Sequence, residues 1–149
     1  TSMSYSPISG LPMSTRSGDL DPAVVLKLLQ ESKLSPATLL QDLEKKSGLL
    51  GLSGESGEVR ELIEKEKNGD AQASLAITYF LNAILQYIAG YAAVLGGADL
   101  VVLTGTIAER SESVSGRLRA GLGFFLKPEQ VIVLPTDEMR EMALALGKF

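Results

Sequence analysis

Hydrophobic positions in the first half of the chain recur with helical spacing, and capping residues mark where each helix begins. Asp21-Pro22 and Ser35-Pro36 each pair an N-cap side chain with a proline at the first helical position. Ser56 is the expected cap of a third helix. The pattern predicts helices over residues 22–32, 36–46 and 58–67. Loops are predicted over residues 1–20 and 48–57, with one short strand near Met3–Tyr5.

The longest apolar element covers residues 71–98 and contains no charged residue. Its length passes the usual test for a membrane span. Polar or small residues nevertheless recur at every fourth position, and no lysine or arginine anchors the end at residues 96–99. We therefore predict a central helix that is buried on nearly all sides and lies at or next to a subunit interface, and no membrane contact. A membrane-associated helix is the alternative. The polar stripe consists of Ser74, Thr78, Asn82, Gln86 and Gly90.

Two similar units end the chain. Short apolar runs at residues 99–104 and 130–134 predict strands that are covered on both faces. Each run leads through a tight turn into a helix, expected over residues 111–125 and 138–146. This alternation predicts a parallel α/β sheet with right-handed crossovers. Because ligands bind beyond the carboxyl ends of such strands, residues 105–109 and 137–138 are predicted to share one functional edge.

The composition limits the chemistry that the chain can perform by itself. Its 149 residues are enough for one folded domain. The absence of histidine and cysteine excludes His-based triads, imidazole or thiolate metal sites, and disulfides, and it suits a cytoplasmic location. A net charge of −4 without a basic block argues against nucleic-acid binding. Because the sequence starts at Thr1 without a methionine or a flexible leader, we expect it to come from within a larger protein.

The segment Met13–Pro22 sets one arginine, Arg16, in a loop of small residues that runs straight into a helix start. A cation held beside helix-terminal N–H groups suits an oxyanion or a phosphate. The alternative is that Arg16 pairs with Asp19 or Asp21 in a purely structural turn.

Three further segments contain residues that suit phosphate or metal chemistry. Residues 52–61 have the pattern of a capped helix start with surface charges. Gly105 follows the first predicted strand, and a glycine there lets a nucleotide approach the backbone. Asp137 and Glu138 follow the second strand, where a carboxylate can hold Mg²⁺. Both acids could equally complement the positive end of the last helix.

In their order along the chain, these four segments resemble acetate kinases, from Thr1 to about Ala145. Residues 13–22 resemble the family's Gly-Thr-Arg-Ser-Gly-Asp-hydrophobe-Asp-Pro signature, and residues 53–60 its Ser-Gly-x-Ser-Ser-Asp-x-Arg adenosine contact. Residues 104–111 resemble its Thr-Gly-Gly-Ile-Gly-Glu-Asn-Ser nucleotide loop, and residues 133–138 its Ile-Pro-Thr-Asn/Asp-Glu-Glu segment. Residues 1–149 are thereby identified as a single carboxy-terminal domain of this family, with residues 1–20 leading in from a missing amino-terminal portion.

The resemblance implies a sugar kinase/actin-like (ribonuclease H-like) α/β fold with a parallel sheet segment and a long central helix. It implies phosphoryl transfer between ATP and acetate, propionate or butyrate, with ATP or ADP and Mg²⁺ as cofactors. In that reading Arg16 is catalytic and Glu138 holds the magnesium. The catalytic aspartate, a second arginine, two histidines and the first phosphate-binding loop lie upstream, and two copies form a homodimer. The nucleotide contacts are Glu58, Val59, Arg60, Gly105, Thr106, Ile107, Ala108 and Glu109.

The chain departs from the family motifs at several positions. Thr106 and Ala108 stand where the family has glycine, and Arg110 stands where it has asparagine, so added side chains crowd the nucleotide loop. Gly57 and Glu58 replace a serine and an aspartate. The connection before the final strand is reduced to residues 126–129. A non-catalytic dimerisation or scaffolding domain with a degraded nucleotide site is therefore the alternative function.

Overall fold

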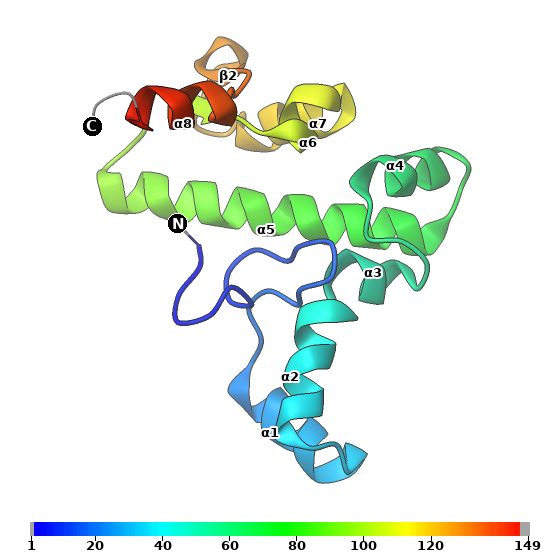
Figure 1. The fold of residues 1–149 in the computed structure, drawn as a ribbon. Coiled ribbons are helices and arrows are strands. Elements are labelled where there is room, and N and C mark those ends of the chain that lie inside the picture. Colours follow the sequence, from blue (N-terminus) through cyan, green and yellow to red (C-terminus); the bar gives the residue numbers. More distant parts are fainter. Residues whose placement is uncertain (1, 147–149) are drawn as a thin grey trace. The chain divides into compact units, whose positions relative to one another are not determined.

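The computed structural model describes residues 2–146, without the side chains of Glu138 and Glu141. The chain forms two compact units, one up to Tyr91 and one from Ala92 onward, and helix α5 runs across the boundary. The first unit is helical (Figure 1). Its helices are α1 (Pro22–Ser32), α2 (Pro36–Lys45), α3 (Gly48–Ser53), α4 (Val59–Lys67) and most of α5 (Ala71–Leu95).

Helices α1 and α2 begin where the capping residues predicted. The Asp21 carboxylate accepts a hydrogen bond from the Ala23 N–H, and the Ser35 hydroxyl accepts one from the Thr38 N–H. Proline occupies the first position of both helices, where no N–H is needed.

The structure corrects three details of the first unit. The residues near Met3–Tyr5 form a loop and not a strand. The predicted loop at 48–57 contains the six-residue helix α3, which is too short and too rich in glycine to give a helical signal. Ser56 is not the cap of α4; Glu58 occupies the cap position, and the Ser56 hydroxyl instead accepts a hydrogen bond from the Glu58 N–H.

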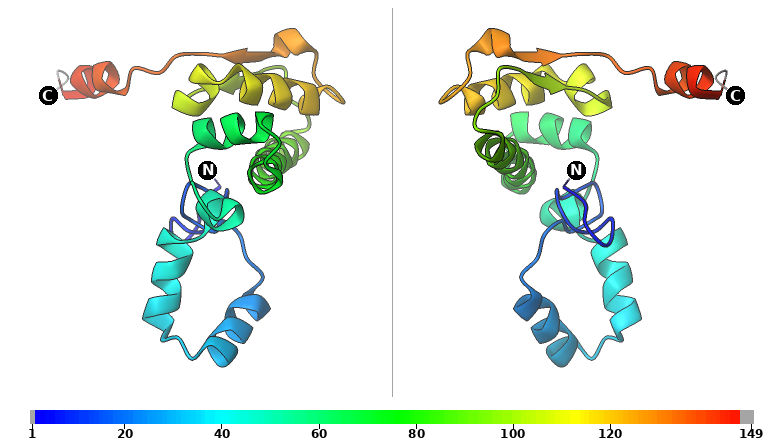
Figure 2. Two further views of the ribbon diagram at one scale, coloured as in Figure 1. Left: turned by 90° about the vertical axis from the view of Figure 1, so that its right-hand side faces the viewer. Right: turned by 90° about the vertical axis from the view of Figure 1, so that its left-hand side faces the viewer.

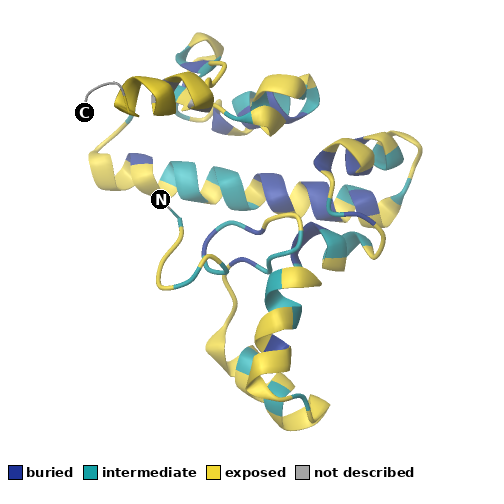
Figure 3. Cartoon of the chain, in the orientation of Figure 1, coloured by how far each residue is buried: buried dark blue, intermediate teal, exposed yellow. Residues whose placement is uncertain are grey.

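Burial along α5 is uneven (Figure 3). The side chains in its amino-terminal half form the core of the first unit, with Ile77 fully buried, whereas Val94 is 86% exposed. The prediction of a helix buried on nearly all sides is therefore wrong. The amino-terminal half buries one face and leaves Leu75 and Tyr79 exposed, and most of the carboxy-terminal half is exposed or only half-buried. Within the described chain, α5 is the one helix long and apolar enough to cross a bilayer, a test that core helices of soluble proteins also pass.

The second unit contains the predicted parallel strand pair. Its elements are β1 (Val101–Leu103), α6 (Thr106–Arg110), α7 (Glu112–Leu122), the 3₁₀ helix η1 (Pro128–Gln130), β2 (Val131–Val133) and α8 (Glu138–Leu146). The two strands pair with Val101 opposite Val131 and Leu103 opposite Val133. Figure 2 shows an extended segment leading from β2 to α8.

The strand burial differs from the prediction. Leu103 and Val131 are buried, but Val102 is 43% exposed, so β1 is not covered on both faces within this chain. Helix α7 supplies buried Val114, Leu118 and Leu122 to the core of this unit. The helix predicted over residues 111–125 is α7, which Ser111 caps and which ends at Leu122. The short helix α6 lies in the segment expected to be a turn and was not predicted.

Candidate functional site

The Arg16 loop is fixed by backbone hydrogen bonds to the end of α2 and the start of α3. The carbonyls of Met13, Ser14 and Thr15 accept hydrogen bonds of 2.9–3.0 Å from the N–H groups of Leu49, Leu50 and Ser47. The Ser17 N–H donates to the Leu43 carbonyl, and the Thr15 hydroxyl donates to the Glu44 carbonyl. The loop around Arg16 is therefore ordered by contacts that do not involve the arginine side chain.

The Arg16 guanidinium makes no hydrogen bond or ion pair with any residue that the structure describes. Asp19 and Asp21, the two acids that could have paired with Arg16 in a purely structural turn, bind other groups. Asp19 accepts hydrogen bonds from the Gly10 N–H and the Tyr87 hydroxyl, and Asp21 caps α1. A partly exposed cation on an ordered loop is the arrangement that an incoming oxyanion requires.

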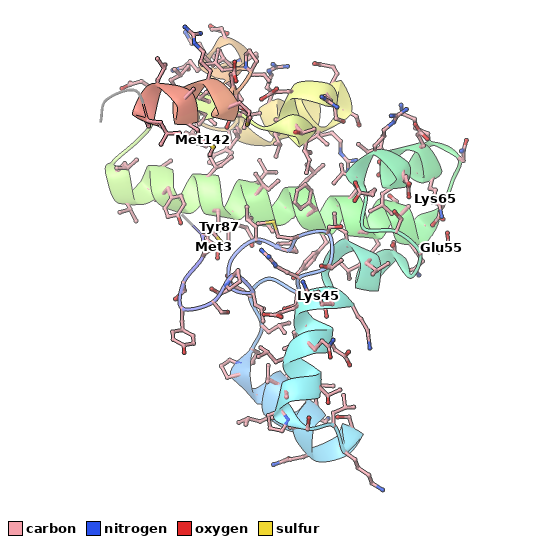
Figure 4. The ribbon with its side chains drawn as sticks, in the orientation of Figure 1. Met3, Lys45, Glu55, Lys65, Tyr87 and Met142 are labelled. Atoms are coloured by element: carbon pink, nitrogen blue, oxygen red, sulfur yellow. The ribbon has the colours of Figure 1, made fainter. Side chains whose placement is uncertain are left out.

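The hydrogen bond between Asp19 and Tyr87 connects the Arg16 loop to α5. Figure 4 labels Tyr87 on this helix. Together with the mutual backbone and side-chain bonds between Asp19 and Gly10, this hydrogen bond closes the segment that carries Arg16. The hydrogen bond to Asp19 and the desolvation of the phenol raise the pKa of Tyr87. Sequence reasoning missed this pair because nothing in the local pattern connects Tyr87 with residues so far away in the chain.

Serine hydroxyls organise the turn that leads into α4. Ser53 Oγ accepts hydrogen bonds from the Glu55 and Ser56 N–H groups and donates to the Ser56 carbonyl. Lys65 pairs with Glu55, and this hydrogen bond is the main cause of the raised pKa of Lys65 (Figure 4).

The three residues predicted to contact adenosine differ in exposure. The side chains of Glu58 and Arg60 are at the surface, where Arg60 Nε lies 3.5 Å from Glu64 Oε1. Val59 is only 8% exposed, so it belongs to the core of the first unit.

The predicted nucleotide loop in the second unit begins at Gly105, whose φ of 88° and ψ of 160° only glycine adopts without strain. Thr106, Ile107 and Glu109 are exposed, and Ala108 is half-buried. An added Cβ at Gly105 would meet no atom within 4 Å, so the backbone here is open on that side.

Glu109 joins the loop after β1 to the segment after β2. One carboxylate oxygen, Oε1, accepts hydrogen bonds from the Gly105 N–H at 2.9 Å, the Thr136 N–H at 2.9 Å and the Thr136 hydroxyl at 3.0 Å. The bonds from Thr136 are the largest cause of the lowered pKa of Glu109. The geometry confirms that the two loops share one edge of the sheet, although the sequence did not single out Thr136.

The metal-binding prediction rests on Glu138, whose side chain lies outside the described residues. The neighbouring Asp137 carboxylate accepts a hydrogen bond from the Arg140 N–H, so this acid caps α8 as the alternative interpretation holds. Among the side chains that are described, no group of three or more acids forms a preformed metal site.

Acidification is expected to release the Glu109 contacts. The carboxylate has a pKa below its ordinary value of 4.5 because it accepts hydrogen bonds in the folded state. Its contribution is therefore present above that ordinary value and is lost as the pH falls through the lower folded pKa. Amide exchange measured by NMR should show protected Gly105 and Thr136 N–H groups near neutral pH and a loss of protection once the pH falls below the lowered pKa of Glu109. Protection factors that stay unchanged after NMR shows the Glu109 carboxyl to be protonated would contradict this expectation.

The comparisons with known proteins agree with one family. The sequence model of the Acetokinase family matches residues 1–139. The acetate kinase of Clostridium novyi (strain NT) is 40% identical over 124 residues, covering 83% of this chain and 31% of the relative. The acetate kinase of Staphylococcus carnosus (strain TM300) is 36% identical over 171 residues, covering 100% of this chain and 43% of the relative. The crystal structure of Porphyromonas gingivalis acetate kinase has a TM-score of 0.85 and 36% identity, covering 92% of this chain and 40% of that one.

This chain is shorter than the part of one relative that it matches. The alignment with the Staphylococcus carnosus relative is 171 positions long for a chain of 149 residues, so that relative contains residues that this chain lacks. The chain closes the connection between α7 and β2 with its own contacts. Gln130 Nε2 donates to the Asp99 carbonyl, and Arg119 Nε donates to the Val131 carbonyl.

The chain spans less than half the length of the curated relatives that it matches. Its fold is confirmed as the actin-like fold of these kinases, with a small parallel sheet and a long central helix. The chain belongs to the acetokinase family.

Proposed function

We propose that this chain is the carboxy-terminal part of a kinase that transfers a phosphoryl group between ATP and acetate, or another short carboxylate, to form an acyl phosphate. The observation that carries the proposal is the Arg16 guanidinium, which has no intramolecular partner among the described residues and stands on an ordered loop. Family membership indicates phosphoryl transfer, and the non-catalytic scaffold is not favoured by it.

Arg16 is proposed to stabilise the negative charge that spreads over the transferring phosphoryl group. Phosphoryl transfer depends mainly on positioning and electrostatic stabilisation, and a planar guanidinium can donate two parallel hydrogen bonds to the phosphoryl oxygens. Because the Arg16 loop is already ordered by backbone bonds, little reorganisation is required when the phosphoryl group arrives.

The adenosine side of the nucleotide is assigned to the two segments that resemble the family motifs. In the first unit the exposed side chains of Glu58 and Arg60 are proposed to form one contact region, with Val59 buried beneath them. In the second unit, the loop over residues 105–109 offers an open backbone at Gly105. The side chains of Thr106 and Ala108 leave less room for the nucleotide in this loop than the glycines of the family motif do.

A magnesium ion fits the residues that this chain provides. Mg²⁺ in kinases is held by one or two carboxylates together with waters and substrate phosphates, so a single acid such as Glu138 at the carboxyl end of a strand suffices. When bound, the ion neutralises charge on the nucleotide phosphates. Asp137 Oδ1 accepts a hydrogen bond from the Arg140 N–H, and Glu138 is proposed to hold the ion because it stands at the position of the first glutamate in the family motif that residues 133–138 resemble.

The test compares the complete protein with residues 1–149 alone. The complete protein should form an acyl phosphate from ATP and at least one of acetate, propionate and butyrate in a hydroxamate assay, whereas residues 1–149 should form none, because the proposed base and first phosphate loop lie upstream. Glu138→Ala in the complete protein should raise the magnesium concentration needed for half-maximal rate. Acyl phosphate formation by residues 1–149 alone, or its absence in the complete protein, would refute the proposal.

We also propose a cytoplasmic homodimer, paired through α5. Large apolar side chains on this helix are exposed in the single chain, among them Leu75 at 53% and Tyr79 at 43%. Soluble monomers seldom expose such a stripe, and a twofold axis would bury it. Ala83→Glu or Ala89→Glu should therefore cause dissociation or misfolding in sedimentation at micromolar concentration, while Gln72→Glu at the exposed start of the helix should not. A stable, soluble wild-type monomer would exclude this assembly.

A further inference from the structure

Glu109 occupies an unusual position for a residue predicted to contact nucleotide. Its Oε1 atom already accepts three hydrogen bonds, one from Gly105 and two from Thr136. A carboxylate oxygen that receives three donors has little capacity left for a ligand hydroxyl. Oε1 therefore acts on the protein itself, whereas the other carboxylate oxygen, Oε2, accepts no hydrogen bond from a described residue.

Two hydrogen bonds to Glu109 hold the Gly105 backbone. Its φ of 88° lies in the region that other residues avoid, and no atom stands within 4 Å of the position of an added Cβ, so nothing packs on that side. The Glu109 N–H donates a hydrogen bond to the Gly105 carbonyl, while the Glu109 carboxylate accepts one from the Gly105 N–H. These two bonds restrain the first residue of the loop.

The contact with Thr136 fixes the segment that follows β2. Beyond the last paired residues, the Leu134 N–H still donates to the Leu103 carbonyl. Two residues further on, the Thr136 N–H and hydroxyl both donate to Glu109 and to no other described residue. We call the hydrogen bonds that Glu109 Oε1 accepts from Gly105 and Thr136 the Glu109 clamp. Thr136 lies two residues before Glu138, so the clamp also restrains the backbone that leads to the proposed magnesium residue.

We propose that Glu109 is a positioning residue, which holds the loop over residues 104–109 and the segment over residues 134–136 in the arrangement that binds nucleotide without contacting the nucleotide itself. This inference rests on the proposed function, because it assigns the same loop to the nucleotide. The expectation that the Glu109 side chain contacts the nucleotide directly is the alternative, and the experiment below separates the two.

The experiment uses the complete protein and measures two properties for each variant. Amide hydrogen exchange at Gly105 and Thr136, without nucleotide, reports whether the clamp is formed. Steady-state kinetics with Mg-ATP and acetate report KM and kcat. The variants are Glu109→Ala, Glu109→Gln and Thr136→Val, with Glu129→Gln as a control that removes one exposed negative charge from the same unit.

Glu109→Ala should remove protection at both amides and raise KM for ATP by about tenfold, with a smaller change in kcat. Glu109→Gln keeps a carbonyl acceptor, so its loss of amide protection and its rise in KM should be smaller than those of Glu109→Ala. Thr136→Val removes only the hydroxyl bond, so both of its changes should be the smallest of the three. Glu129→Gln should match the wild type. This graded order in KM is not expected from a merely structural role, which would lower the melting temperature and leave KM at lower temperature unchanged.

Two results would overturn the proposal. If Glu109→Ala raises KM while amide protection in the free protein stays unchanged, the carboxylate contacts the nucleotide directly. If protection is lost while KM is unchanged, the clamp exists but does not serve nucleotide binding. Failure of the proposed function gives a different signature, because the wild-type protein would then show no Mg-ATP-dependent turnover whatever the exchange data show.

Discussion

Replacing Arg16 by alanine in the complete protein is expected to lower kcat by about a thousandfold and to change KM for ATP by less than about threefold. The reason is that a guanidinium directed at the transferring phosphoryl group acts mainly in the transition state, where the charge on the phosphoryl oxygens is rearranged. The loop itself should survive the change, because its hydrogen bonds come from the backbone and from Thr15. Steady-state kinetics and a melting curve on the same preparation separate the two effects.

Two further variants make the Arg16 test sharper. Arg16→Lys keeps the charge but loses the planar pair of donors, so it should recover only part of the rate. Lys27→Ala removes a positive charge from the exposed surface of α1, where it pairs with Glu31 at 3.8 Å, and should leave kcat unchanged. An unchanged kcat in Arg16→Ala would show that the guanidinium does not meet the phosphoryl group.

Elements that are set by local chemistry were predictable from the sequence. Asp21-Pro22 and Ser35-Pro36 start α1 and α2 as predicted, because a cap and a proline act within one turn of the helix. The parallel pairing of β1 and β2 also followed, since two strands joined by a helical crossover can pair in few other ways.

Features set by contacts between distant residues were not predictable in this way. Helix α3 exists because its first N–H groups donate to carbonyls of the Arg16 loop, more than thirty positions earlier in the chain. The contact between Glu109 and Thr136 likewise depends on how the two strand ends meet. Helix α5 was expected to be buried throughout because composition reports how apolar a helix is and not how much of it this chain covers.

The second large effect is expected at Gly48, the first residue of α3. Its φ of 60° disfavours other residues, and an added Cβ would lie 2.5 Å from the Arg16 carbonyl oxygen and closer still to that of Met13. Gly48→Ala should therefore push α3 away from the loop and break the bonds that Leu49 and Leu50 donate. We expect a loss of about 3 kcal/mol in the free energy of unfolding, measured by denaturant titration, and a large fall in kcat because Arg16 is displaced.

Gly69→Ala is the matched control for backbone strain alone. Gly69 has a φ of 88° but no atom within 4 Å of an added Cβ, so the substitution should cost only about 1 kcal/mol and leave kcat unchanged. Equal losses in the two variants would show that strain, and not the collision with the Arg16 loop, explains the effect at Gly48.

A substitution at Gly57 tests the Arg16 loop independently of Gly48. An added Cβ there would lie 2.6 Å from the Ser14 carbonyl oxygen and closer to the Ser14 hydroxyl, although the φ of Gly57 is not in the left-handed region. The acetate kinase motifs that residues 13–22 and 53–60 resemble have glycine at the position of Ser14 and serine at the position of Gly57, the reverse of this chain. Gly57→Ser alone should destabilise the Arg16 loop and lower kcat, and Ser14→Gly combined with Gly57→Ser should restore part of both. If the double variant is no better than Gly57→Ser alone, the two positions are not coupled and the Arg16 loop tolerates the added side chain for another reason.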